Sequence, residues 1–174
     1  MKIAVTGTTS GFGEYLSTNW GSRVVSVDLR KGVDYSFQLI KDCDIFFNHA
    51  YNNTDQSTLF ELVFQEWVDH PKTIINFGSS AIYNESPFAP LYVSNKRHLN
   101  FFSKSLAMAY PNKKVRVINF NPSTLENNKM FPEFNKLSFL SLEKVLKFLI
   151  ELPQEVEISE LCLKSTSLNK MQII

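Results

Sequence analysis

Tyr92 and Lys96 lie four positions apart in a segment, Pro90 to Ala109, that predicts a helix, so their side chains share one helix face. A nearby ammonium favours the tyrosinate and is expected to lower the pKa of Tyr92 from about 10 toward neutrality. Such a tyrosine gives and takes protons near ambient pH. Ser79 stands 13 positions before Tyr92, after an apolar run that predicts a strand, where its hydroxyl can steady charge on a substrate oxygen. Taken singly, each of the three residues is better explained structurally: Tyr92 as a packing aromatic, Lys96 as a solvated charge and Ser79 as a turn residue.

A glycine-rich turn follows the first apolar run of the chain. Gly7 lets the chain turn off the expected strand, Gly11 lets backbone approach a pyrophosphate, and Gly13 lets the following helix pack closely. The start of that helix leaves N–H groups unpaired and carries partial positive charge, so a phosphate is a natural partner. Strand, glycine turn and helix in this order indicate half of a dinucleotide-binding unit.

An acidic residue stands where such a unit needs one. Asp28 ends the second expected strand, 21 positions after Gly7. A carboxylate at this place binds a ribose 2′-hydroxyl and repels a 2′-phosphate, so NAD(H) is favoured over NADP(H). Arg30 lies two residues later and would soften that preference. The alternative interpretation of Asp28 is an ordinary acid in a strand-end turn.

The expected elements predict a single α/β domain over residues 1–174. It is a Rossmann-type, doubly wound, mostly parallel sheet of about six to seven strands, with helices on both faces. Residues 31–35 offer at most a stub of a third strand, and Thr58 to Glu61 resembles a capping box that starts a helix. The other strands are expected at 2–6, 23–28, 44–48, 73–78, 115–120 and 158–164, and the helices at 12–19, 36–41, 58–70, 90–109 and 142–152.

The ordered set of motifs resembles the short-chain dehydrogenases/reductases, with this chain as an unusually short member. The resemblance rests on Thr6-Gly7-x-x-x-Gly11-x-Gly13, on Ser79, and on Tyr92-x-x-x-Lys96. Asn48-His49-Ala50 is similar to the family's Asn-Asn-Ala-Gly, and Asn121-Pro122-Ser123 to its Pro-Gly turn. The similarity covers about the whole chain. It implies an NAD(P)(H)-dependent oxidoreductase that interconverts a carbonyl and an alcohol by hydride transfer.

The resemblance also implies roles for individual residues. Ser79, Tyr92 and Lys96 would be catalytic, with Lys96 also holding the nicotinamide ribose. Many relatives add an Asn that orders a water, for which Asn52 and Asn53 are the nearby candidates unless the residue is absent. No metal is implied. The implied cofactor-binding residues are Gly7, Thr9, Ser10, Gly11, Phe12, Gly13, Asp28, Asn48, Ala50, Tyr92, Lys96, Pro122 and Thr124.

Two other functions remain open on the sequence alone. One is a catalytically weak dinucleotide-binding sensor or scaffold, and the other is an epimerase or dehydratase of the same family. The net charge of +1 argues against a nucleic-acid or membrane partner, and the apolar loop at 125–138 suggests an uncharged small-molecule carbonyl or alcohol substrate. Two cysteines without metal-ligand spacing, and no signal peptide, favour a cytoplasmic protein.

The helix expected from Pro90 bears on assembly. Leu99, Phe102 and Leu106 lie on one side of it, and Phe101 and Met108 lie elsewhere. Excess apolar faces could pack against a second subunit, as a homodimer or homotetramer. The alternative is that these faces cover the sheet.

Overall fold

The centre of the computed structural model, which describes residues 1–83, 89–130 and 135–165, is a six-stranded, all-parallel sheet. The order across the sheet is β2-β1-β3-β4-β5-β6. The strands are β1 (Ile3–Thr6), β2 (Val24–Val27), β3 (Ile45–Asn48), β4 (Thr73–Phe77), β5 (Arg116–Pro122) and β6 (Glu160–Leu163). Strands β1, β3, β4 and β5 are buried along their whole length and predominantly apolar, as expected of parallel strands that are covered on both faces.

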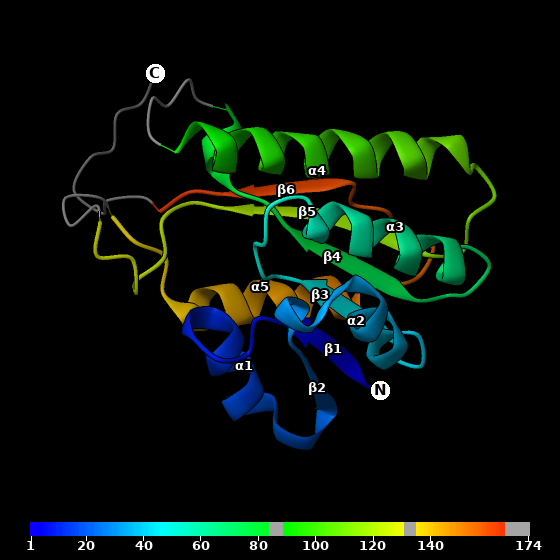
Figure 1. Ribbon diagram of the computed structural model, residues 1–174, viewed down its shortest axis with the longest axis horizontal. Coiled ribbons are helices and arrows are strands. Elements are labelled where there is room, and N and C mark those ends of the chain that lie inside the picture. The colour runs from blue at the N-terminus through cyan, green and yellow to red at the C-terminus, as the bar shows by residue number, and fades with distance from the viewer. Residues whose placement is uncertain (84–88, 131–134, 166–174) are drawn as a thin grey trace.

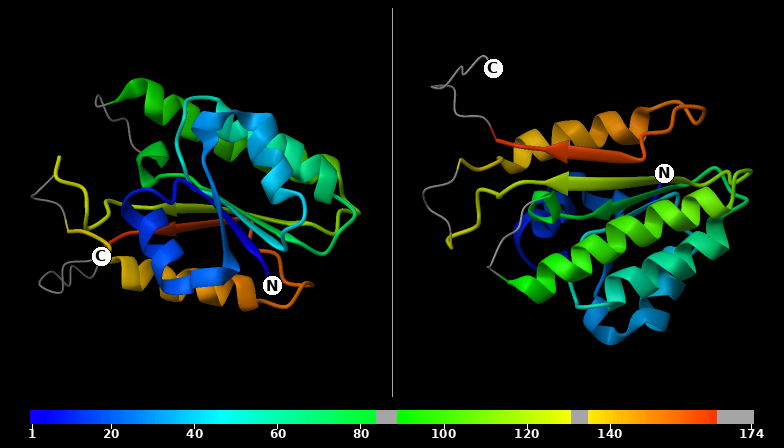
Figure 2. Two further views of the ribbon diagram at one scale, coloured as in Figure 1. Left: turned by 60° about the horizontal axis from the view of Figure 1, so that its bottom comes forward. Right: turned by 90° about the horizontal axis from the view of Figure 1, so that it is seen from above.

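Within the described residues, five helices cover the two faces of the sheet (Figure 1). Helices α1 (Gly11–Trp20) and α5 (Phe139–Glu151) pack on one face, and α2 (Val33–Ile40), α3 (Asp55–Trp67) and α4 (Pro90–Ala109) on the other (Figure 2). Successive strand residues alternate between the two cores: Val5 joins the α1 side and Ala4 the α3 side. The predicted Rossmann-type fold is therefore confirmed.

The chain changes direction across the sheet at β1. It first adds β2 on one side of β1 and then adds β3 on the other. Such a switch point opens a crevice at the carboxyl ends of the strands, where ligands bind in this class of fold. The Thr6 hydroxyl links the end of β1 to the segment after β3, because it accepts the backbone N–H groups of His49 and Ala50, each at 2.8 Å.

The stub of a third strand at residues 31–35 was a wrong prediction. These residues lie in a short 3₁₀ turn, Leu29–Lys31, and in α2. Val33, Phe37 and Ile40 recur at helical spacing and pack against the core, so burial of this stripe selects the helix. Six strands remain, at the lower end of the predicted range.

The capping box at Thr58 was also wrong. Helix α3 begins three residues earlier, at Asp55, and the Thr58 hydroxyl donates within the helix to the Thr54 carbonyl oxygen at 3.3 Å. The earlier start brings Gln56 into the first turn, beside the carboxyl edge of the sheet. None of the helices in the described ranges combines the length and apolar content that a membrane span requires.

Candidate active site

The glycine turn forms a tight cradle between β1 and α1, as its spacing predicts. Gly7 and Gly11 have φ values of +76° and +58°, in the left-handed region where a side chain is strained. A Cβ on Gly13 would lie 2.1 Å from the Gly7 carbonyl oxygen, so only glycine lets α1 start this close to β1. The first turn of α1 brings backbone N–H groups to the crevice, and this arrangement fits a pyrophosphate.

The remaining predicted residues of the turn differ in what they offer a cofactor. Thr9 and Ser10 are exposed on the turn. The Phe12 ring is buried, and it packs against aromatic rings that include His49 and Phe77, with centroids 6.1 and 6.0 Å away. Phe12 therefore offers only its backbone to a ligand, and its side chain belongs to the core.

Asp28 follows β2 at the edge of the same crevice. Its carboxylate accepts two hydrogen bonds from the Arg30 guanidinium, Nε to Oδ1 at 2.8 Å and Nη2 to Oδ2 at 3.0 Å. These bonds hold the pKa of Asp28 below its ordinary value, so the carboxylate is charged at neutral pH. Asp28 therefore lies at the end of β2, as predicted, and its charge is compensated by the Arg30 guanidinium.

Tyr92 and Ser79 meet between α4 and the end of β4. Their side chains share a hydrogen bond, and the Ser79 hydroxyl is also held by the Ala81 backbone N–H at 3.2 Å. Burial raises the pKa of Tyr92 above its ordinary value of 10, against the lowering effect of the bond to Ser79. The expected depression of this pKa by Lys96 is therefore wrong.

The position of Lys96 explains that result. Its side chain is only 3% exposed, and Nζ donates to the Phe77 carbonyl oxygen at 2.6 Å and to Gln56 Oε1 at 2.8 Å. Nζ lies 5.7 Å from the centroid of the Tyr92 ring, over the ring face. Burial lowers the pKa of Lys96 from 10.5 to about 7, so at neutral pH its charge is only partly present.

Gln56 lies beside Lys96 and is the second acceptor of its ammonium. Its Nε2 donates to two backbone carbonyl oxygens, of Asn48 at 2.6 Å and of Phe77 at 3.2 Å. Because carbonyl oxygens only accept, Nε2 must face them and Oε1 must face Lys96. The side chain is 2% exposed, so this orientation is locked by packing as well.

The two asparagines considered for a catalytic role, Asn52 and Asn53, lie just before the start of α3. Asn52 Nδ2 donates to Asp55 Oδ2 at 2.6 Å, near the start of α3. Asn53 has a φ of +47° and forms part of the turn before the helix. Both residues shape the entry to α3 rather than contact Lys96.

Three buried asparagines on adjacent strands, which we call the asparagine row, form a line across the sheet. Asn48, Asn76 and Asn119 are register partners on β3, β4 and β5. Asn48 Nδ2 donates to Asn76 Oδ1 at 2.9 Å, and Asn76 Nδ2 to Asn119 Oδ1 at 3.5 Å. Asn48 Nδ2 also donates to the Gln56 carbonyl oxygen at 2.9 Å, so the row fixes the first turn of α3 to the sheet.

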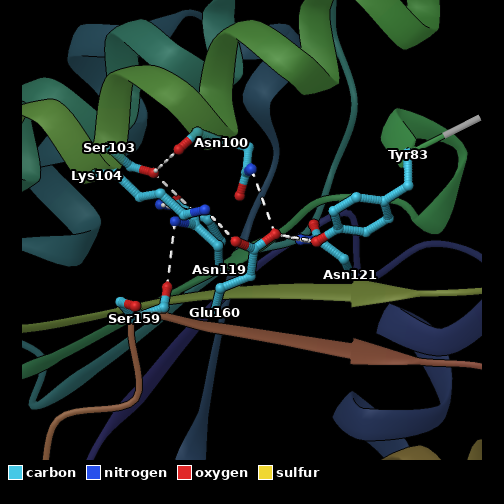
Figure 3. Close-up of polar contacts among 9 residues, drawn as sticks. Tyr83, Asn100, Ser103, Lys104, Asn119, Asn121, Ser159 and Glu160 are labelled. Carbon is cyan, nitrogen blue, oxygen red and sulfur yellow. Dashed lines mark hydrogen bonds and ion pairs between the residues drawn. The ribbon is translucent and has the colours of Figure 1, made fainter.

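The next register position after Asn119 is Glu160, the centre of a second polar cluster (Figure 3). Its carboxylate accepts from Lys104 of α4, from the Tyr83 hydroxyl, and from Asn121 Nδ2 at 3.0 Å. Burial and Glu160 together raise the pKa of Tyr83 to about 12. Because Tyr83 ends the short turn that follows Ser79, the cluster ties that turn to β6 and α4.

The other predicted cofactor contacts lie along the same edge. Asn48 uses its Nδ2 in the asparagine row, while its Oδ1 is buried without a hydrogen-bond partner in the described part of the chain. Ala50 is held by Thr6, and Pro122 ends β5 with Thr124 just beyond it. Within the described residues, no group of three or more His, Cys, Asp or Glu side chains could hold a metal ion. The loop at 125–138 lies partly outside the described residues.

Sequence reasoning missed a second tyrosine at the site. The Tyr51 ring lies edge-on to the Tyr92 ring, with centroids 4.9 Å apart. It stands at the position where the resembled Asn-Asn-Ala-Gly motif has glycine, and this departure from the motif was the available signal.

No protein-family model and no curated protein matches the sequence. Solved structures do match. An alcohol dehydrogenase from the archaeon Thermococcus sibiricus, complexed with 5-hydroxy-NADP, superposes with a TM-score of 0.76 at 16% identity, covering 95% of this chain and 97% of that one. A short-chain dehydrogenase/reductase from Vibrio parahaemolyticus gives 0.75 at 12% identity, covering 95% and 100%. The 3-alpha-hydroxysteroid dehydrogenase from Pseudomonas sp. B-0831, complexed with NADH, gives 0.74 at 14% identity, covering 94% and 95%.

The chain has the fold of the short-chain dehydrogenases/reductases. The architecture that the sequence resemblance implied is thereby confirmed over nearly its whole length. At these identities the likeness establishes the fold, and the case for a function depends on the residues at the crevice.

Proposed function

We propose that this chain is an NAD(P)(H)-dependent oxidoreductase that interconverts a carbonyl and an alcohol by hydride transfer. The observation that carries the proposal is the hydrogen-bonded Ser79–Tyr92 pair beside the buried Lys96, at the edge of the sheet where the glycine turn opens. Two of the superposed dehydrogenases are described in complex with 5-hydroxy-NADP or NADH, which supports the same chemistry here.

The cofactor would lie along the carboxyl edge. The glycine turn and the first turn of α1 would hold its pyrophosphate, and Asp28 its adenosine ribose. An ammonium has three N–H donors, and two of those of Lys96 are already used, so one remains for a hydroxyl of the nicotinamide ribose. A bound nicotinamide supplies the hydride in reduction and accepts it in oxidation.

Tyr92 is the proposed proton donor. Because its pKa lies above 10, it is a neutral phenol at pH 7 and is ready to protonate a carbonyl oxygen that receives negative charge. The Ser79 hydroxyl is hydrogen-bonded to Tyr92 and would donate to the same carbonyl oxygen of the substrate. These protonation states favour carbonyl reduction over alcohol oxidation at neutral pH.

The proposed preference for NAD(H) rests on the charged Asp28 carboxylate, since it would repel a 2′-phosphate. Arg30 weakens that repulsion, because its guanidinium is largely exposed and could turn from Asp28 to a phosphate. We expect Asp28→Asn to narrow the difference between the NADH and NADPH dissociation constants. Arg30→Ala should widen it, as measured by fluorescence titration.

We further propose that two copies associate through α4. Phe101 and Met108, seven positions apart on this helix, are 74% and 81% exposed, whereas Leu99 is buried and Phe102 and Leu106 pack against the core. Analytical ultracentrifugation of the chain and of its Phe101→Ser variant tests this. A monomer at all concentrations would contradict it.

The function is tested by NADH-dependent reduction of a panel of ketones and aldehydes, with Tyr92→Phe as the variant. We expect kcat to fall by roughly 10²-fold or more while the NADH dissociation constant is retained. Tyr110→Phe, at the far end of α4, is the matched control and should keep full activity. NADH binding without turnover of any substrate by the unaltered protein would favour the sensor or scaffold function instead.

A further inference from the structure

Tyr51 has a fixed place beside the proposed catalytic residues. It follows β3 closely, and its ring is inclined by 73° to the Tyr92 ring at a centroid distance of 4.9 Å. Its hydroxyl accepts a hydrogen bond from Asn95 Nδ2 at 3.0 Å. Asn95 directly precedes Lys96 on α4, so this bond holds the ring against the segment that carries the lysine. Tyr51 is 38% exposed, so its ring lies on the solvent side of Tyr92 and Lys96.

Two adjacent tyrosine rings lie within reach of the Lys96 ammonium, both on the same side of it. Nζ is 5.6 Å from the Tyr51 centroid and 5.7 Å from the Tyr92 centroid, both within the range at which a cation is attracted to a ring face. Its hydrogen-bond acceptors, the Phe77 carbonyl oxygen of β4 and Gln56 Oε1 of α3, are neutral.

The titratable groups that face Lys96 are two tyrosines and a histidine. Tyr92 on α4 is a phenol at neutral pH, and Tyr51 follows β3. His49 is close enough to sense the ammonium, and burial with that repulsion lowers its pKa to about 4. Within the described residues, the lysine thus has no carboxylate in an ion pair with it, and the rings supply the electron-rich surfaces.

We propose that Tyr51 is a positioning residue whose ring, packed edge-on against that of Tyr92, attracts the Lys96 ammonium and holds it in place. The inference rests on the proposed function, in which the charged form of Lys96 holds the nicotinamide ribose. Attraction to a ring stabilises the charged lysine without a carboxylate, whose negative charge would oppose formation of tyrosinate at Tyr92. Tyr51 thereby keeps Lys96 protonated to a higher pH than burial alone would allow.

The test is a direct titration of Lys96 by NMR in protein labelled with ¹³C at the lysine ε-carbons, with Lys96→Met to assign the signal. Tyr51→Leu keeps an apolar side chain at this place but removes the ring. We expect the Lys96 pKa to fall by roughly one pH unit, a tenfold weaker proton affinity. Tyr51→Phe keeps the ring and should hold the pKa to within about threefold in affinity.

The matched control is Tyr110→Leu. Tyr110 is also 38% exposed and packs edge-on to another ring, Phe64, but lies at the opposite end of α4. It should leave the Lys96 titration unchanged. A Lys96 pKa that is unchanged or raised in Tyr51→Leu would overturn the proposal, because a rise is what better hydration of the lysine alone would produce.

The kinetic consequence is measured separately. In an active enzyme, the alkaline limb of kcat/KM should move to lower pH in Tyr51→Leu by the same factor as the NMR titration. Because the NMR titration needs no turnover, a shifted Lys96 pKa in a protein inactive on every substrate would refute the proposed function and leave the role of Tyr51 standing. Turnover by an enzyme whose Lys96 pKa is unshifted in Tyr51→Leu would support the proposed function and refute the role of Tyr51.

Discussion

Replacing Lys96 by Met tests the electrostatic description of the site without requiring activity. In the folded chain, burial lowers the pKa of Lys96 from 10.5 to about 7. The folded state therefore loses this proton near pH 7, while the unfolded state keeps it up to about pH 10.5. Between those values the unfolded state binds more protons, so stability rises with pH, and below pH 7 this group contributes no slope.

The magnitude follows from linkage. Each pH unit within that window changes the free energy of unfolding by about 1.36 kcal/mol. The wild-type chain should therefore gain roughly 2.5 kcal/mol relative to Lys96→Met between pH 6 and pH 9. The variant leaves Gln56 Oε1 and the Phe77 carbonyl oxygen without their donor, but that cost is the same at every pH and does not enter the difference.

The assay is urea unfolding of both proteins at several pH values from 6 to 9. Other titrating groups are common to both proteins, so their contributions cancel. The pKa values of His49 and Tyr92 lie outside the assay range of pH 6 to 9. The exposed Lys129→Met is the matched control, and its difference from the wild-type chain should stay flat. Parallel pH profiles for wild type and Lys96→Met would refute the reasoning, since they would mean that Lys96 is as easily protonated as in water.

Three further outcomes are expected. Gly13→Ala places a Cβ 2.1 Å from a carbonyl oxygen of the same turn, so it should abolish NADH binding in a fluorescence titration and cost about 2 kcal/mol in urea unfolding; undiminished binding would count against the cradle. The ion pair with Lys147 leads the contacts that lower the pKa of Glu143 to about 2. The stability it adds is complete above about pH 4.5 and lost as pH falls toward 2, so Glu143→Gln should flatten acid unfolding in that interval, and an unchanged acid limb would contradict this. Gln56→Leu removes an acceptor from the Lys96 ammonium and should lower the Lys96 pKa in the NMR titration, whereas no change would remove Gln56 from the site.

Local requirements made part of the site predictable from the sequence. A turn that needs positive φ and close helix packing admits little but glycine. The spacing of Gly7, Gly11 and Gly13 therefore predicts this turn from the sequence. The alternation of apolar strands with helical segments predicts a doubly wound, mostly parallel sheet. Asp28 could be placed because the cradle sets its distance along the chain.

The contacts of Lys96 could not be predicted in the same way. Gln56 and Tyr51 reach the lysine across 40 and 45 positions of sequence, and only the packing of α3 and the end of β3 against α4 brings them together. The start of α3 was misplaced by three residues, which hid Gln56. The burial that raises the pKa of Tyr92 is likewise a property of the whole fold, and it reversed the direction expected from the four-residue spacing alone.

The start of helix α2 was a different kind of error, because its evidence was in the sequence. Val33, Phe37 and Ile40 follow helical spacing, but β-branched and aromatic residues beside Gly32 also suit a short strand. The structure selects the helix because this stripe packs against the core beside α3.

The central claim is that the crevice binds a nicotinamide dinucleotide and that Tyr92 passes the proton that accompanies the hydride. Its most direct test is to supply NADH deuterated on the transferred position of the nicotinamide, with a carbonyl substrate panel, and to measure deuterium in the alcohol product by mass spectrometry. The account predicts deuterium on the carbinol carbon for the wild-type chain and a loss of roughly 10²-fold or more in rate for Tyr92→Phe. Deuterium transfer at an unchanged rate in Tyr92→Phe, or none from bound NADH to any carbonyl in the wild-type chain, would contradict it.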